Sequence, residues 1–178
     1  MKKDTHSILS HYKYCPVCGS ACFHENSFKS LLCDNCGLEL FINPGAAYVA
    51  FIFNEQGELL VVRRKEEPAK GTLDLPGGFS DIGETAEEGI CREVKEETGL
   101  DVISTEYLFT RPNRYHFSGL EIPTLDMFFR CNVRDIAVLH ANDDAEACLW
   151  LPVKDIHPED FGLDSIREGV TDFLKNQK

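Results

Sequence analysis

Two apolar runs near the middle of the chain predict buried β-strands. The runs AAYVAFIF (46–53) and ELLVVRR (58–64) flank the polar turn sequence NEQG. Short apolar runs bounded by turn residues are typical of strands that are buried on both faces. We therefore predict a hairpin of these two strands. The stretches PTLDMFFRC (123–131) and ACLWLP (147–152) predict further strands.

Two other stretches have the periodicity of helices. Residues 86–98 lie between Thr85, which opens a Thr-x-x-Glu capping box, and Gly99, which suits a left-handed helix end. The stretch 165–176 has apolar residues at helical spacing and opens with a Ser-x-x-Glu capping box at Ser165. Strands interleaved with two helices predict an α/β sandwich.

The composition changes near residues 43–45, where the sequence Asn-Pro-Gly is typical of a junction. Residues 1–44 are rich in cysteine, and we predict that they form a small unit before a main domain of residues 45–178. Four lysines balance four acidic residues in the first segment, so the main domain carries the whole formal charge of −12. Such an acidic chain is an unlikely general partner for nucleic acid, since binding to phosphates needs an excess of Lys and Arg.

The sequence contains no apolar run of about 18 residues, so we expect no membrane span. The first 15 residues, MKKDTHSILSHYKYC, lack the apolar region of a secretory signal. We therefore expect a cytoplasmic protein, in which cysteines normally stay reduced.

Four cysteines have the spacing of a structural zinc site. CPVCG and CDNCG form a C-x2-C-x14-C-x2-C pattern, and four thiolates provide the closed tetrahedral shell of structural zinc. The predicted ligands are Cys15, Cys18, Cys33 and Cys36. The alternative is four unligated thiols. The other cysteines, Cys22, Cys91, Cys131 and Cys148, have no paired spacing and are interpreted as small core residues.

The stretch from Gly77 to Leu100 carries an unusual number of carboxylates on a predicted helix. Glu93, Glu96 and Glu97 occupy an arc of the helical wheel that overlaps the apolar arc. An unpaired carboxylate in the buried sector would be costly. A hard divalent cation resolves this conflict, since Mg²⁺ bridges carboxylates to substrate phosphates. A solvated acidic helix face is the alternative, but it does not explain the neighbouring glycines.

At this point the sequence resembles the Nudix hydrolases, whose motif is G-x5-E-x7-R-E-U-x-E-E-x-G-U, with U an aliphatic residue. All nine specified positions match: Gly78, Glu84, Arg92, Glu93, Val94, Glu96, Glu97, Gly99 and Leu100. The resemblance implies an α/β/α sandwich with a mixed sheet, preceded here by a small zinc ribbon. It also implies that Glu93, Glu96, Glu97 and the Gly77 carbonyl bind Mg²⁺ or Mn²⁺. Arg92 would orient a carboxylate, and Glu84 would support the loop.

The sequence does not identify the general base, because family members use either a motif glutamate or a carboxylate of a later loop. The stretch NDDAEACLW supplies Asp143, Asp144 and Glu146, of which Glu146 resembles the commoner placement. A surface loop charge is the alternative reading of Glu146.

A zinc-binding segment directly before such a domain resembles the NADH pyrophosphatases, which carry S-Q-P-W-P-F-P-x-S after the Nudix motif. This chain has TRPNRYHFS at residues 110–118, which departs from that motif at several positions. Arg111 and Arg114 suit phosphate or another charged group, and Tyr115 can stack on a base. The alternative is a loop whose arginines pair with the acidic surface.

The sequence is compatible with three functions. The first is a metal-dependent pyrophosphohydrolase of a nucleoside diphosphate linked to another moiety, with NADH or ADP-ribose-like dinucleotides as the leading substrates. The second is a nucleotide or ADP-ribose sensor without turnover, and the third is an RNA-end (NAD-cap) processing enzyme. The sequence does not decide between a monomer and a homodimer.

Overall fold

The computed structural model describes residues 8–141 and 145–176, which group into two compact units. The first unit comprises the chain up to Pro44 together with Arg114–Pro123, and the second comprises Gly45–Asn113 and the chain from Thr124 onward. The sequence did not predict that the segment 114–123 groups with the first unit.

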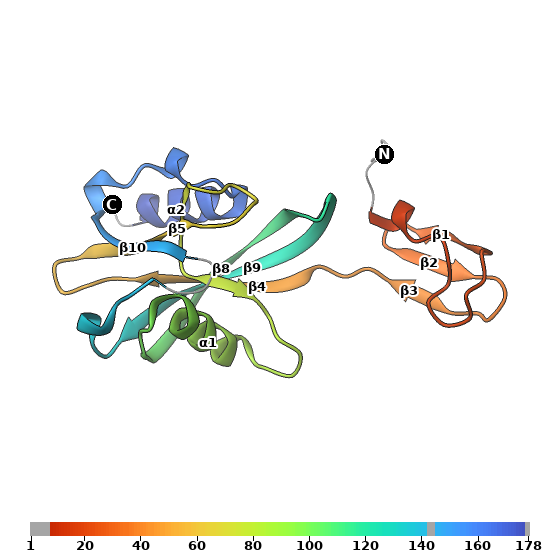
Figure 1. Cartoon of the computed structure of the whole chain (residues 1–178), viewed down its shortest axis with the longest axis horizontal. Coiled ribbons are helices and arrows are strands. Elements are labelled where there is room, and N and C mark those ends of the chain that lie inside the picture. Colours follow the sequence, from red (N-terminus) through yellow and green to blue (C-terminus); the bar gives the residue numbers. More distant parts are fainter. Residues whose placement is uncertain (1–7, 142–144, 177–178) are drawn as a thin grey trace. The chain divides into compact units, whose positions relative to one another are not determined.

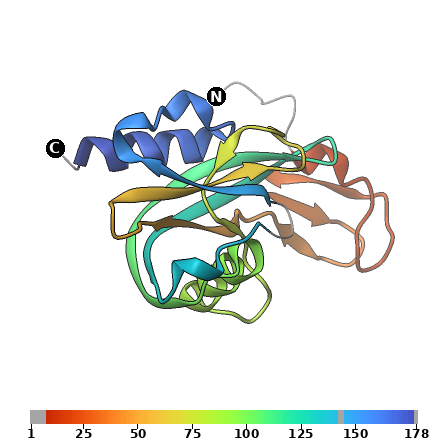
Figure 2. The same cartoon turned by 60° about the vertical axis from the view of Figure 1, so that its left-hand side comes forward.

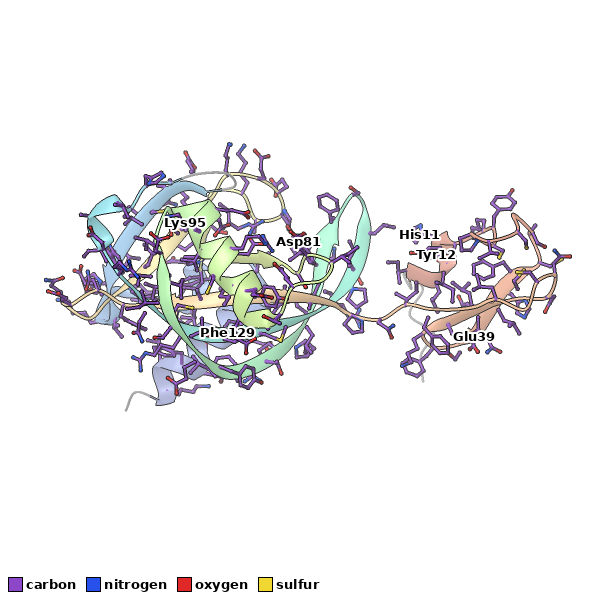
Figure 3. The ribbon with its side chains drawn as sticks, turned by 90° about the horizontal axis from the view of Figure 1, so that it is seen from below. His11, Tyr12, Glu39, Asp81, Lys95 and Phe129 are labelled. Atoms are coloured by element: carbon purple, nitrogen blue, oxygen red, sulfur yellow. The ribbon has the colours of Figure 1, made fainter. Side chains whose placement is uncertain are left out.

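The cysteine-rich part of the first unit is a short antiparallel sheet. It contains the 3₁₀ helix η1 (Ile8–His11) and the strands β1 (Phe23–Ser27), β2 (Ser30–Cys33) and β3 (Glu39–Phe41), in the order β1-β2-β3. Figure 3 labels His11 and Tyr12 at η1 and Glu39 on β3. Its small core consists of Leu9, Cys15, Phe23, Leu31 and Cys33.

The second unit is an α/β sandwich with a mixed sheet, as predicted. One sheet has the order β7-β4-β9-β8 and the other the order β10-β5-β6. The strands are β4 (Gly45–Ile52), β5 (Glu58–Arg64), β6 (Leu73–Asp74), β7 (Gly77–Phe79), β8 (Val102–Phe117), β9 (Leu120–Val133) and β10 (Ala145–Pro152). The helices are α1 (Ala86–Thr98), α2 (Asp164–Asn176) and the 3₁₀ turns η2 (Ile136–Val138), η3 (Val153–Asp155) and η4 (Pro158–Asp160). Within this unit, α1 and α2 lie on opposite sides of the strands (Figure 1), as the turned view in Figure 2 also shows.

The two helices pack on separate apolar cores. Alternate residues of β4 face opposite ways, so that Tyr48, Ala50 and Ile52 belong to the α1 core while Val49 and Phe51 belong to the α2 core. On the α1 side, Ile90 and Val94 are fully buried. Burial of such side chains contributes about 1.5–3 kcal/mol each, against about 1 kcal/mol for a helix cap. Burial of these side chains therefore stabilises α1 more than its capping hydrogen bonds do.

The predicted hairpin of residues 46–53 and 58–64 is wrong in its pairing. The turn forms, because the Gly57 N–H donates to the Asn54 carbonyl at 3.0 Å, and one isolated bridge joins Phe53 and Leu59. Beyond it the strands enter different sheets: β4 pairs with β7 and β9, and β5 pairs with β10 and β6. Two strands that are apolar on both faces gain more as central strands, each with two neighbours, than as a two-stranded ribbon.

Two further predictions differ from the structure. The helix near the C-terminus is present, but it begins at Asp164, and the Arg167 N–H donates to the Leu163 carbonyl. Ser165 is therefore not a cap; its hydroxyl donates to Asp126 at 2.5 Å. Residues 110–117 belong to the long strand β8 and are not a loop. Among the described residues, no helix is long and apolar enough to cross a bilayer.

Candidate active site

The predicted carboxylate helix is α1, and its two ends are fixed by local contacts. The Thr85 hydroxyl accepts the Glu88 N–H at 3.2 Å, while the Glu88 carboxylate accepts the Thr85 N–H at 2.8 Å. At the other end Gly99 adopts a left-handed conformation, with φ 73°, and its N–H donates to the Lys95 carbonyl. The helix therefore spans residues 86–98, as predicted, and it directly follows the glycine-rich strand β7 through a short loop that contains Asp81 (Figure 3).

Arg92 joins three glutamates and the end of β7. Its Nε and Nη2 donate to the two carboxylate oxygens of Glu84 at 3.0 and 2.8 Å. Its Nη1 donates to Glu93 at 2.8 Å and to Glu96 at 3.0 Å, and its Nη2 also reaches the Phe79 carbonyl at 3.1 Å. Bidentate pairing of this kind fixes direction as well as charge. The Arg92 guanidinium lowers the pKa of Glu84, assisted by the Asp81 N–H.

Glu93 and Glu96 differ in their environment although both contact Arg92. The Glu93 side chain is 14% exposed and the Glu96 side chain is 48% exposed. Burial raises the pKa of Glu93, and Arg92 opposes this rise. A half-buried carboxylate of this kind is stabilised by a nearby cation.

Glu97 is held by the backbone of β7. Its carboxylate accepts the Gly77 N–H at 3.0 Å. Close packing explains the paired glycines, because a Cβ on Gly77 would lie 2.0 Å from the Tyr48 carbonyl oxygen, and a Cβ on Gly78 would lie 2.6 Å from the Glu93 carboxylate. Gly77 therefore allows close approach to the backbone of β4, and Gly78 allows close approach to Glu93.

The donor set of this site suits Mg²⁺ or Mn²⁺, which take carboxylate and carbonyl oxygens as ligands. Glu93 and Glu96 accept hydrogen bonds from the same Nη1 atom of Arg92, whereas Glu97 accepts the Gly77 N–H. Within residues 8–141 and 145–176, only the four cysteines gather three or more ligand atoms within 4.8 Å of one another. A metal held by all three glutamates would therefore require their carboxylates to move closer together.

The four predicted zinc ligands do converge. The sulfur atoms of Cys15 and Cys36, and those of Cys18 and Cys33, are each 3.6 Å apart. A tetrahedral zinc with bonds of about 2.3 Å would separate its sulfurs by about 3.8 Å. Each C-x2-C pair forms a turn closed by its glycine, since the Gly19 N–H donates to the Cys15 carbonyl and the Gly37 N–H to the Cys33 carbonyl, both at 2.9 Å. The cluster fits structural zinc.

The thiols outside the cluster only partly follow the prediction of core residues. Cys131 is buried, Cys91 and Cys148 are half-buried, and Cys22 is exposed. The prediction is therefore wrong for Cys22, which does not belong to the small core of the cysteine-rich segment.

The predicted substrate residues lie along β8. Arg111 pairs with Asp172 of α2, and its guanidinium lies 5.5 Å from the centre of the Phe109 ring. Arg114 and Tyr115 belong to the first unit, where Arg114 lies 3.4 Å from Glu121 and the Tyr115 ring stacks on Phe117, with centroids 6.4 Å apart. The pairing of Arg111 agrees with the alternative reading of this stretch. A role of these residues in substrate binding stays a prediction.

Glu146, the predicted general base, lies at a register irregularity at the start of β10. Two residues further on, the Cys148 sulfur lies 3.9 Å from the Glu97 carbonyl, so β10 runs beside the end of α1. The other candidates, Asp143 and Asp144, lie outside the described residues.

An ion pair that was not predicted from the sequence lies just before Gly77 and Gly78. Arg64 and Asp74 are joined at 2.6 Å, and Asp74 is buried. The signal that could have found this pair is the acidic residue inside the apolar sequence TLDLPGG, since a buried carboxylate requires a partner.

Comparison with known proteins found relatives of this chain. The relatives include an ADP-ribose pyrophosphatase from Methanocaldococcus jannaschii, 43% identical over 77 residues, which are 42% of this chain and 45% of that protein. They also include an NAD-capped RNA hydrolase NudC from Shigella flexneri, 27% identical over 101 residues, which are 57% of this chain and 38% of that protein. The matched region thus spans less than half the length of each of these relatives.

Solved structures share the fold. A NUDIX hydrolase from Nitrosomonas europaea superposes with a TM-score of 0.73 at 19% identity, over 93% of this chain and 92% of that one. The NUDIX domain of Shewanella oneidensis NrtR, solved with ADP ribose, superposes with a TM-score of 0.62 at 19% identity, over 78% and 91% of the two chains. The NUDIX domain profile matches residues 43–172, most of the chain. The chain therefore belongs to the NUDIX family.

Proposed function

We propose that this chain is a metal-dependent hydrolase that splits the diphosphate bond of a nucleoside diphosphate linked to another moiety, with ADP-ribose or NADH-like dinucleotides as substrates. The observation that carries the proposal is the set of three glutamates on α1 beside the Gly77–Gly78 backbone, in which Arg92 contacts Glu93 and Glu96 and the Gly77 N–H contacts Glu97. The names of the relatives, an ADP-ribose pyrophosphatase and NAD-capped RNA hydrolases, support this substrate class. Reduced zinc thiolates suit a cytoplasmic enzyme.

In this proposal Glu93, Glu96, Glu97 and the Gly77 carbonyl hold Mg²⁺ or Mn²⁺, which when bound polarises a phosphoryl oxygen and lowers the pKa of water. Arg92 directs Glu93 and Glu96 through its hydrogen bonds to both carboxylates. Water adds its oxygen to one phosphorus, the bond from that phosphorus to the bridging oxygen breaks, and the leaving phosphate keeps the bridging oxygen. Glu146 accepts the proton of the water, and Arg111, Arg114 and Tyr115 bind the substrate.

A product assay tests the function. The substrates are ADP-ribose, NADH, NAD, dinucleoside polyphosphates, nucleoside triphosphates and a short NAD-capped RNA, each with Mg²⁺ and with Mn²⁺. We expect two phosphomonoesters from ADP-ribose or NADH. Faster turnover of the capped RNA would favour RNA-end processing, the function in the names of the NudC relatives. Tight binding of ADP-ribose without turnover of any substrate would instead indicate a sensor.

Gly78→Ala is expected to lower kcat/KM for ADP-ribose about 10- to 100-fold, the range for residues that orient metal ligands. The new methyl group would overlap the Glu93 carboxylate and so displace it from the metal. The protein should stay folded, because the displaced group is the end of a flexible side chain. Steady-state kinetics and thermal unfolding measure the two effects. Gly45→Ala is the matched control, since its Cβ would only touch the Phe79 ring at 3.9 Å. Equal kinetics of the two variants would contradict the placement of Glu93.

A further inference from the structure

A buried ion pair lies directly upstream of the glycines. Arg64, at the end of β5, contacts Asp74 on β6 through Nη1 and Oδ2 at 2.6 Å, and its Nε donates to the Pro68 carbonyl at 2.7 Å. The Asp74 residue is 6% exposed. A charge-assisted contact of this length fixes the orientation of both side chains.

A second buried carboxylate nearby has its own donors. Asp126 accepts the Thr124 hydroxyl at 2.7 Å, the Ser165 hydroxyl at 2.5 Å and the Asn113 amide at 3.1 Å. Burial raises the pKa of Asp74, with a further rise from the charge of Asp126, and Arg64 opposes this rise. Asp126 is thus hydrogen-bonded by neutral groups, whereas Asp74 pairs with the guanidinium of Arg64.

Backbone contacts continue from this pair to the candidate active site. The other carboxylate oxygen of Asp74 accepts the Leu75 N–H at 2.8 Å, and the Pro76 carbonyl accepts the Ala50 N–H at 2.8 Å. The next residue is Gly77, whose N–H donates to the Glu97 carboxylate at 3.0 Å. The four consecutive residues 74–77 therefore each make a hydrogen bond, and these bonds connect Arg64 to Glu97.

We infer that Arg64 and Asp74 are positioning residues for the Gly77–Glu97 contact and thereby set the affinity of the site for a divalent metal. The contacts of Asp74 lead to Gly77 through the backbone of residues 75–77. The pair fixes the direction of the Leu75 N–H, which fixes the peptide leading to Gly77. The link to metal affinity rests on the proposed function, whereas the link to Gly77 does not.

The test compares Asp74→Asn and Arg64→Lys with a core variant of similar stability. Asn keeps an acceptor for Leu75 but loses the charge, and Lys keeps the charge but cannot reach both Asp74 and the Pro68 carbonyl in the same way. Val170→Ala is the control, since it leaves a cavity in the core that also contains Leu75 but removes no contact of Arg64 or Asp74. Hydrogen exchange of the Gly77 amide in the metal-free protein and Mn²⁺ titration by water-proton relaxation are the readouts.

We expect Gly77 exchange to become at least 10-fold faster in Asp74→Asn, and Mn²⁺ binding about 10-fold weaker, with a smaller change in Arg64→Lys. Val170→Ala should lower the melting temperature without either effect. Gly77 exchange at the wild-type rate in both ion-pair variants would overturn the inference, as would unchanged Mn²⁺ affinity with faster exchange. If Asp74→Asn does not fold, Arg64→Lys carries the same test. If Glu97→Gln binds Mn²⁺ like the wild type, the proposed metal site fails, and Gly77 exchange alone decides the positioning role.

Discussion

Glu97→Gln is expected to reduce hydrolysis of ADP-ribose or NADH at least about 100-fold while the protein stays folded. Glutamine keeps the size of the side chain, and its carbonyl oxygen can still accept the Gly77 N–H that Glu97 accepts now. The substitution therefore removes a negative charge from the metal site and little else. Mg²⁺ and Mn²⁺ prefer charged oxygen ligands, so the metal should bind more weakly.

The measurement is kcat and KM over a range of Mg²⁺ concentrations, together with the thermal unfolding of the metal-free protein. The melting temperature should be unchanged or slightly higher, since a half-buried carboxylate loses its charge. Glu87→Gln is the matched control, because Glu87 is exposed in the first turn of the same helix. Turnover like that of the wild type by Glu97→Gln at saturating Mg²⁺ would show that this carboxylate is not a catalytic ligand.

The features of the site that the sequence predicted are those set by local chemistry. The bounds of α1 follow from the Thr85 cap and from the left-handed Gly99, which are contacts within one turn of the chain. The cysteine cluster also follows from spacing, because each C-x2-C pair closes its own turn. Such signals are present in a single stretch of sequence and do not depend on the rest of the fold.

The features that the sequence did not predict depend on distant segments. The pairing of β4 with β9 joins residues 45–52 to residues 124–131, and nothing in either stretch specifies the other. The same holds for Ser165, whose capping role is lost because Asp126, 39 residues away, accepts its hydroxyl. The ion pair of Arg111 with Asp172 of α2 likewise joins residues that are distant in the sequence. In each case tertiary packing selects the partner, and the local sequence does not specify it.

The arrangement around Arg92 illustrates the same limit inside the site. The sequence placed Glu93, Glu96 and Glu97 on one side of a helix, but their hydrogen bonds to Arg92 and Gly77 depend on the exact side-chain contacts. Arg92 places one positive charge beside Glu84, Glu93 and Glu96. This charge offsets part of the repulsion between neighbouring carboxylates.

Cys33→Ser is expected to abolish zinc binding and to unfold the cysteine-rich segment. Cys33 is fully buried and belongs to a core of only five buried residues, which is too small to fold about 40 residues alone. Structural zinc contributes an apparent free energy of about 10–16 kcal/mol in small zinc-finger peptides, which exceeds what such a core supplies. We therefore expect the loss of one thiolate to lower the free energy of unfolding of this segment more than the loss of any single apolar contact would.

Elemental analysis should find close to one zinc per chain in the wild type and far less in Cys33→Ser. Limited proteolysis should then cut the first 44 residues, while the second unit, which has its own two cores, stays protected. The chemical step on a small dinucleotide should change less than the stability does, because four thiolates leave no open position on the metal. Cys22→Ser is the control, since Cys22 is exposed and outside the cluster. Wild-type protein purified without a chelator and free of zinc would contradict the assignment, and a full zinc content in Cys33→Ser would exclude Cys33 as a ligand.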